Sequence, residues 1–225
     1  RYVATLQLGA ATDRGDKDGA IITQAPVAEL SPTDIEAVLQ DFLGEQTQVP
    51  PMYSALKHQG KPLYEYARAG IEIERPARPI RIDLLTLKSY SNHVIQFDVL
   101  CSKGTYVRTL AEDIAKSLGT LGYLTALHRI QTGSLKAEQM VMLADIETDL
   151  SGCLLPYDLP LQHLQALSLN GLETDKIQHG GKLAIERPQT DWVRLYDPDE
   201  RFIGIGEWQV EKQLLKPKRL FNLDS

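Results

Sequence analysis

The stretch from Val94 to Leu118 constrains the fold most, because the spacing of its apolar residues changes part-way along it. Apolar side chains first alternate with polar ones, which is the period of a strand with one buried face. After a turn that contains Gly104 they recur at helical spacing, at Val107, Leu110, Ala111, Ile114 and Leu118. The sequence therefore predicts a strand over Val94–Cys101, a turn, and a helix that begins close to Arg108.

The first half of the chain contains further signals of regular structure. Tyr2–Leu8 alternates and stops at Gly9, which predicts a strand. Ser31 is a good N-cap, and Pro32 and the acidic Asp34 follow it as in a capping box. We expect a helix from there, ended by Gly44.

Other segments complete the secondary-structure prediction. Short helices are expected at Leu63–Arg68 and Gln139–Ile146, strands at Ile80–Leu87, Trp192–Tyr196, Phe202–Trp208 and Leu214–Phe221, and Leu121–Leu127 is compatible with the start of another helix. Strands joined mostly by hairpins, without regular βαβ units, predict an α+β fold with a mixed, mostly antiparallel sheet. The prolines of Cys153–Pro160 indicate a domain boundary before a small β-rich domain.

Composition excludes some classes of protein and leaves others open. The two cysteines, Cys101 and Cys153, have no metal-ligand spacing and suggest no disulfide framework, so a reducing cytosol is expected. No apolar run approaches membrane-spanning length. The net charge of −6 argues mildly against a nucleic-acid partner, yet basic residues concentrate at Lys57–Lys88 and Lys212–Arg219. Charge alone therefore fits solvated faces as well as an RNA groove.

Arg108 is placed unusually for a basic residue. A cation at the positive N-terminal end of a helix costs up to about 1 kcal/mol, and a carboxylate held by the guanidinium would offset that cost. The alternative is a surface arginine that pairs with Glu112 or Asp113 or is simply solvated, and spacing alone favours this alternative.

Three blocks of sequence carry a family resemblance. They are the opening RY, strand, LG-x-x-TD pattern, then PPMYSALKHQGKPLYEYARAGIEIERPARPI, then CSKGTYVRTL. Together they closely resemble the TruB family of tRNA pseudouridine synthases. The later FIGIGE and the basic strand after it are similar to that family's PUA-type RNA-binding domain. The resemblance implies a catalytic domain over residues 1–155, with an RNA-clamp insertion at about 48–78, and a PUA-type domain over 161–225.

The resemblance also implies an activity. Family members convert the T-loop uridine of tRNA to pseudouridine without cofactor or metal, and we expect a cytoplasmic, monomeric enzyme that binds the tRNA T-stem-loop without an obligatory protein partner. The nucleophile is an aspartate in a block that reads roughly G-H-x-G-x-L-D-P. The 225 residues contain no such block. We therefore expect this chain to be inactive alone, with Arg108 lacking the carboxylate that it should hold.

Site residues follow from the resemblance position by position. Tyr2, Arg108 and Leu127 match catalytic positions: the tyrosine stacks on the target base, the arginine pairs with the aspartate, and the leucine packs against the floor of the site. Tyr106 is expected to line the same pocket. In the insertion, the residues expected to hold RNA are Tyr53, Lys57, Lys61, Tyr64 and Arg68.

The residues themselves leave simpler readings open. Tyr2 and Leu127 fit ordinary core positions, and the insertion fits a solvated helical hairpin with its tyrosines packed inward. For the whole chain, the alternatives to the enzyme are a module that binds RNA or assists its folding without modifying it, and an acidic protein-interaction domain, which only the net charge supports.

Overall fold

The computed structural model describes residues 1–221, and the chain divides into two compact units, Arg1–Gln131 and Thr132–Ser225. The units divide earlier in the chain than the predicted boundary at Cys153–Pro160, since residues 132–155 group with the second unit. Residues 222–225 of the predicted domain 161–225 lie outside the described residues.

The first unit is built on a five-stranded sheet, whose strand order is β4-β7-β8-β1-β9. Its strands are β1 (Tyr2–Leu8), β4 (Gly44–Gln48), β7 (Arg78–Ser91), β8 (Val94–Cys101) and β9 (Gly122–Arg129). All four neighbouring pairs are antiparallel. The two strands whose sequences alternate, β1 and β8, are neighbours in the interior of the sheet. Their alternating apolar residues lie on one face of it, and most of them are buried.

One face of this sheet carries the core of the unit. Ala4 and Leu6 of β1 lie opposite Phe97 and Ile95 of β8, and all four are fully buried. The helices α1 (Pro32–Asp41) and α3 (Val107–Ser117) contribute their apolar side chains to the same cluster. Ser31 caps α1 in the predicted capping box with Asp34. The core thus fixes the start of α3 relative to the sheet.

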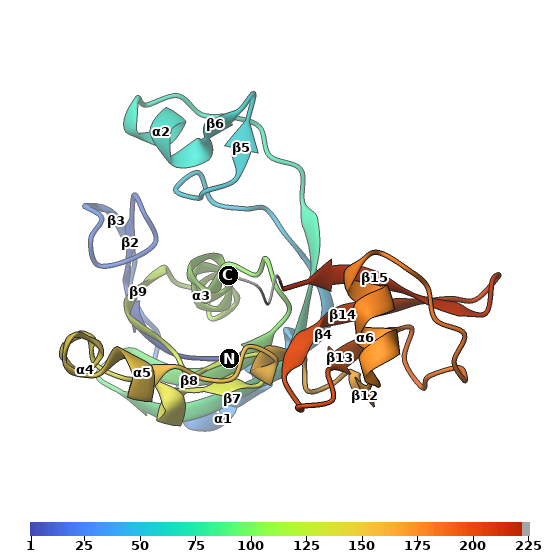
Figure 1. Ribbon diagram of the computed structural model, residues 1–225. Helices are drawn as coiled ribbons and strands as arrows, with labels where there is room; N and C mark the ends of the chain where they lie inside the picture. Colours follow the sequence, from blue (N-terminus) through green and yellow to red (C-terminus); the bar gives the residue numbers. More distant parts are fainter. Residues whose placement is uncertain (222–225) are drawn as a thin grey trace. The chain divides into compact units, whose positions relative to one another are not determined.

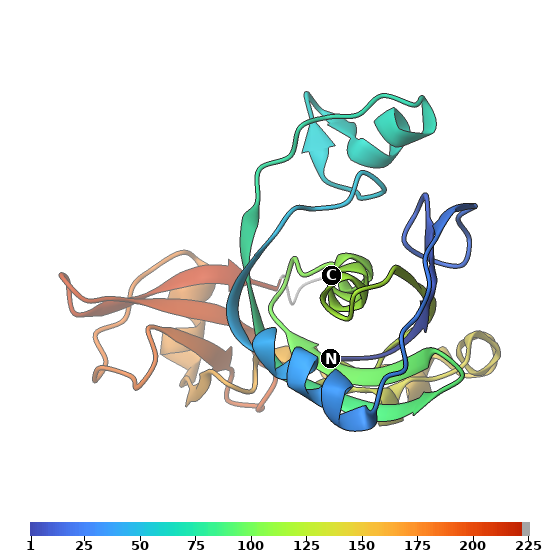
Figure 2. The same ribbon diagram turned by 180° about the vertical axis from the view of Figure 1, so that it is seen from behind.

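Two excursions extend beyond the sheet on the side where α3 lies (Figures 1 and 2). The first is the hairpin of β2 (Ala10–Thr12) and β3 (Ile21–Gln24). The second leaves the sheet after Gln48 and returns at Arg78, which form the last pair of the β4–β7 ladder. It carries β5 (Lys57–His58), β6 (Lys61–Pro62) and α2 (Leu63–Arg68), and we call residues 48–78 the insertion.

The second unit contains a four-stranded sheet in the order β12-β13-β14-β15. Its strands are β12 (Gln165–Ser168), β13 (Trp192–Tyr196), β14 (Phe202–Gln209) and β15 (Leu214–Leu220), and β12 pairs with β13 in parallel. Helix α6 (Gly171–Gln178) contributes Ile177 to a separate core with Val193 and Leu195. Before this sheet come β10 (Gln131–Thr132), β11 (Leu135–Lys136), the 3-10 turns η1 (Ala137–Gln139) and η2 (Leu159–Leu161), α4 (Leu143–Thr148) and α5 (Leu150–Cys153).

The α+β prediction is confirmed, and most predicted elements are present. Three predictions differ from the structure. Most of the predicted helix start at Leu121–Leu127 lies in strand β9, from Gly122 on, because these residues pair with β1. The helix α1 ends at Asp41 with Phe42 as its C-cap, so Gly44 does not end it but begins β4. The helix expected at Gln139–Ile146 lies later, at Leu143–Thr148.

Candidate functional site

Arg108 lies in the first turn of α3, and three oxygens surround its guanidinium. Nη1 donates to the carboxylate Oδ2 of Asp16 and to the carbonyl of Arg14, each at 3.0 Å. Nη2 donates to the carbonyl of Tyr53 at 2.7 Å. The side chains of Arg108 and Asp16 are 23% and 28% exposed, so water reaches the ion pair only in part. The guanidinium therefore joins α3, the β2–β3 loop and the insertion.

The position of Asp16 follows from how the β2–β3 loop packs. The backbones of Gly15 and Lys17 exchange hydrogen bonds with Leu124 of β9, which ties the loop to the sheet edge. Gly15 has a φ of +73°, and a Cβ atom there would lie 2.6 Å from Glu112 Oε1. Glycine at this position lets the loop lie against α3, and Asp16 then faces Arg108.

The prediction that Arg108 lacks a carboxylate partner in this chain is wrong, because Asp16 supplies one. The simpler reading, in which Glu112 or Asp113 pairs with it, is also not what the structure shows. Asp113 pairs with Lys116. Burial raises the pKa of Glu112, and Arg108 opposes that rise only weakly. The cost of a cation at the helix start is thus offset from a distant loop.

Gln48 fixes the base of the insertion to the start of α3. Its amide donates to the carbonyl of Tyr106 at 3.1 Å and accepts from the Tyr106 N–H at 2.8 Å. Gln48 is 5% exposed, so the two bonds form in a dry setting. Tyr106 is thereby held by its backbone beside Arg108, with its own side chain half-buried. The prediction that Tyr106 lines the pocket remains a prediction.

Tyr2 and Leu127 lie on adjacent strands and on one face of the sheet. In the register of β1 and β9, Tyr2 lies opposite Arg129 and Ala4 opposite Leu127. Arg129 donates from Nε to the Tyr2 hydroxyl at 3.1 Å, and its Cζ lies 5.2 Å from the centre of the Tyr2 ring. Leu127 is 47% exposed, so it is no ordinary core leucine. The core face of the sheet therefore becomes open at this end of β9.

Aromatic and basic side chains of the insertion pair with one another. The Cζ atom of Arg68 lies 5.3 Å from the ring centre of Tyr64. The Nζ atom of Lys61 lies 5.0 Å from the ring centre of Tyr66. The Tyr53 ring instead contacts the guanidinium of Arg14, whose Cζ lies 5.2 Å from the ring centre. Lys57 is exposed in β5. These stacked pairs preorganise cations over aromatic faces, an arrangement that suits contacts to both bases and phosphates.

The described residues 1–221 contain no helix long and apolar enough to cross a membrane. Within the same range, His, Cys, Asp and Glu side chains form no group that could hold a metal ion. Cys101 and Cys153 are unpaired and half-buried.

Family models match nearly the whole chain. The TruB family pseudouridylate synthase N-terminal domain matches residues 1–107, the tRNA pseudouridylate synthase B C-terminal domain matches 108–162, and the Pseudouridine synthase II TruB C-terminal model matches 166–221. The tRNA pseudouridine synthase B of Hydrogenovibrio crunogenus is 64% identical over 224 residues, which are 100% of this chain and 74% of that protein. The chain belongs to the TruB family.

A second relative has the same name, and a solved structure shares the fold. The tRNA pseudouridine synthase B of Psychrobacter cryohalolentis is 47% identical over 87% of this chain, but the match covers 55% of that protein. Among solved structures, a chain of a Cbf5-Nop10-Gar1 complex superimposes with a TM-score of 0.68 at 17% identity, over 98% of this chain and 66% of that one. At that identity the likeness shows the fold alone.

Several residues that build this candidate site were not predicted from the sequence. They are Asp16, Gln48, Arg14 and Arg129. Asp16 lies in a loop with two further aspartates, Asp13 and Asp18, so its residue type alone does not distinguish it. Its one signal was the glycine before it, which permits the turn that presents the carboxylate to α3.

Proposed function

We propose that this chain carries the RNA-binding surface and part of the active site of a tRNA pseudouridine synthase that acts on the T-loop uridine. The observation that carries the proposal is the 64% identity to a tRNA pseudouridine synthase B over the whole chain. The anchored Arg108 and the open sheet face at Tyr2 and Leu127 support it. The reaction is an isomerisation: the N1–C1′ bond breaks, a C5–C1′ bond forms, and the proton lost from C5 is balanced by one gained at N1.

Three residues are proposed to contact or order the reacting nucleotide. Tyr2 would stack on the flipped base, since base–aromatic stacking contributes about 1–3 kcal/mol. Leu127 would give the base an apolar support. Arg108 would hold the nucleophilic carboxylate in its ionised form when the GHxG–LDP block is present, with Asp16 already bound to the same guanidinium.

The insertion is proposed to close over the T-stem-loop through Tyr53, Lys57, Lys61, Tyr64 and Arg68. Its attachment at Gln48, Arg78 and Arg108 supports this role, because each joins it to the sheet or to α3. We assign the catalytic role to residues 1–155 and RNA binding of PUA type to the sheet of the second unit. The protein is proposed to act in the cytoplasm as a monomer, without cofactor, metal or an obligatory protein partner.

A pair of chains tests the activity. Residues 1–225 alone and the same chain extended by a GHxG–LDP segment are incubated with unmodified tRNA, and pseudouridine is measured. We expect turnover only from the extended chain, because the nucleophilic aspartate resides in the added segment. Turnover by residues 1–225 alone would contradict their proposed inactivity. An extended chain that binds tRNA but forms no pseudouridine would instead support the non-catalytic RNA-binding module.

A further inference from the structure

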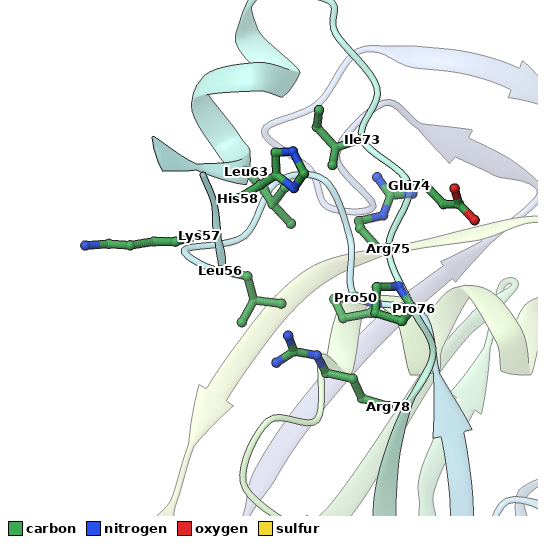
Figure 3. A pocket seen from close by; sticks show the side chains of 10 residues that line it. All are labelled: Pro50, Leu56, Lys57, His58, Leu63, Ile73, Glu74, Arg75, Pro76 and Arg78. Carbon is green, nitrogen blue, oxygen red and sulfur yellow. The ribbon is translucent and has the colours of Figure 1, made fainter. Parts of the chain in front are cut away.

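A small cavity lies within the insertion, close to the point where it returns to the sheet. Its volume is about 70 Å³, several times the roughly 10–15 Å³ that one water molecule requires. Apolar walls come from Pro50, Leu56 and Ile73, and basic groups from His58, Arg75 and Arg78. Figure 3 shows Arg75 and Arg78 extending from the same stretch of chain, while Lys57 points away from the cavity.

Arg75 is the unusual residue of this cavity. Its side chain is only 17% exposed, and both Nε and Nη1 are buried without a hydrogen-bond acceptor among the described residues. The third nitrogen, Nη2, reaches only Glu72 at 3.5 Å, and that carboxylate is 82% exposed. A buried guanidinium whose donors are unsatisfied is costly, so such a group is normally found with an anion.

The surrounding carboxylates leave Nε and Nη1 of Arg75 without an anion, since Glu72 reaches only Nη2. Glu74 lies on the cavity wall but turns its carboxylate away from Arg75 and Arg78 in Figure 3. Residues 48–78 contain five lysines and arginines against three acidic residues, although the whole chain has a net charge of −6. A site in which cations gather around an unsatisfied guanidinium, in an otherwise acidic protein, is selective for a negatively charged ligand.

We propose that this cavity is a phosphate-binding site with Arg75 as its anchor. The planar fork of a guanidinium matches two phosphate oxygens, and Arg78 and His58 would contact the remaining ones. The apolar side chains of Pro50, Leu56 and Ile73 would strengthen these contacts by lowering the polarity beside the bound anion. Resting on the proposed function, the phosphate is one of the RNA backbone, bound where the insertion meets the sheet. The alternative source of the same chemistry is a free phosphate ion.

The first arm of the test uses inorganic phosphate alone. Phosphate is titrated into the isotope-labelled 225-residue chain at constant ionic strength, with chloride as the reference salt, and the NMR signals of Arg75 Nε–H and the Ile73 and Leu56 amides are followed. We expect saturable shifts with phosphate only. R75Q should abolish the amide shifts, and R75K, which keeps the charge but not the fork, should weaken binding several-fold.

A matched control distinguishes the loss of the proposed site from the loss of one positive charge elsewhere on the chain. R81Q removes the same charge from a neighbouring arginine that pairs with Asp83 and is 62% exposed, so it should behave as the unaltered chain. Each variant is first compared by thermal unfolding, and R78Q repeats the comparison if R75Q does not fold. Equal phosphate shifts in R75Q and R81Q would overturn the proposal.

The second arm identifies the source of the phosphate. The affinity for a T-stem-loop RNA is measured across a range of salt concentrations, and R75Q should lower the slope of log Kd against log salt by about 1 relative to R81Q. Loss of phosphate binding with an unchanged slope would overturn the RNA source and leave a free-phosphate site. If the unaltered chain binds no RNA at all, the proposed function fails, while the phosphate arm still decides the site.

Discussion

The guanidinium of Arg108 is bound by three oxygens, and only the one from Asp16 carries a charge. The carbonyls of Arg14 and Tyr53 orient the group but do not neutralise it. Because α3 presents its positive end at the same place, the Asp16 carboxylate balances both the side chain and the helix dipole. Single-residue changes here should therefore separate charge from geometry.

Asp16→Asn removes the charge and keeps the shape. We expect the free energy of unfolding to fall by about 1–2 kcal/mol, between the values typical of exposed and of buried ion pairs, since both side chains are about a quarter exposed. Urea unfolding followed by far-ultraviolet circular dichroism measures the loss. Asp83→Asn, which breaks the more exposed pair with Arg81, should change stability by less than about 0.5 kcal/mol. Equal losses of stability in the two variants would contradict a larger contribution from the less exposed pair of Asp16 and Arg108.

Asp158 gives the second unit a dependence on acid. Hydrogen bonds from the Tyr196 hydroxyl, and then from Arg194, hold the pKa of its carboxyl below the ordinary value. A depressed folded-state pKa stabilises the fold at pH above the unfolded value of about 4, and this stabilisation is lost as the pH falls through the folded-state pKa.

Asp158→Asn should therefore lower stability by about 1–2 kcal/mol at neutral pH, as expected for hydrogen bonds to a charged group, and the deficit should shrink as the pH falls below about 4. Tryptophan fluorescence during urea unfolding measures this in the second unit, because both tryptophans, Trp192 and Trp208, lie there. If the stability deficit of Asp158→Asn stayed constant from about pH 6 to about pH 3, the carboxylate would be ruled out as its source.

At the scale of elements, strand β9 shows how pairing overrides local spacing. Leu121, Leu124 and Leu127 recur every three residues, which fits a helix. In the structure this segment is a strand because it pairs with β1. Leu124 is buried, whereas Leu127 is half exposed. Gly122, the first residue of β9, lies close to Leu6 of β1 and to Ala115 of α3.

Gly122→Ala should destabilise the first unit because the close packing leaves no room for a methyl group. A Cβ atom there would lie 2.6 Å from Leu6 Cδ1 and 2.8 Å from Ala115 Cβ. We expect a loss of about 1–3 kcal/mol in the free energy of unfolding, as is typical of overpacked cores. Gly171→Ala is the matched control, since no atom lies within 4 Å of its added methyl group and its φ is ordinary. That variant should be neutral or slightly stabilised, and a similar loss in both would contradict the steric explanation.

At the scale of the whole molecule, those features that depend on residues close together in the chain could be predicted from the sequence. The capping box at Ser31, the helix that starts at Val107 and the strands β1, β8, β13, β14 and β15 all depend on local patterns. The partner of Arg108 could not be predicted in this way, since Asp16 lies 92 residues away along the chain and reaches it only after the loop docks on β9. Gln48 and Tyr106, which are 58 residues apart, are a second case.

Two separate cores should make the chain unfold in two parts. Ile114 belongs to the core of the first unit and Leu195 to that of the second, and both are fully buried. Replacing either with alanine typically costs about 2–5 kcal/mol. Leu195→Ala should shift the urea midpoint seen by tryptophan fluorescence, whereas Ile114→Ala should shift only the transition seen by circular dichroism. If Ile114→Ala moved the fluorescence midpoint as far as Leu195→Ala does, the chain would unfold as one cooperative unit, contrary to this prediction.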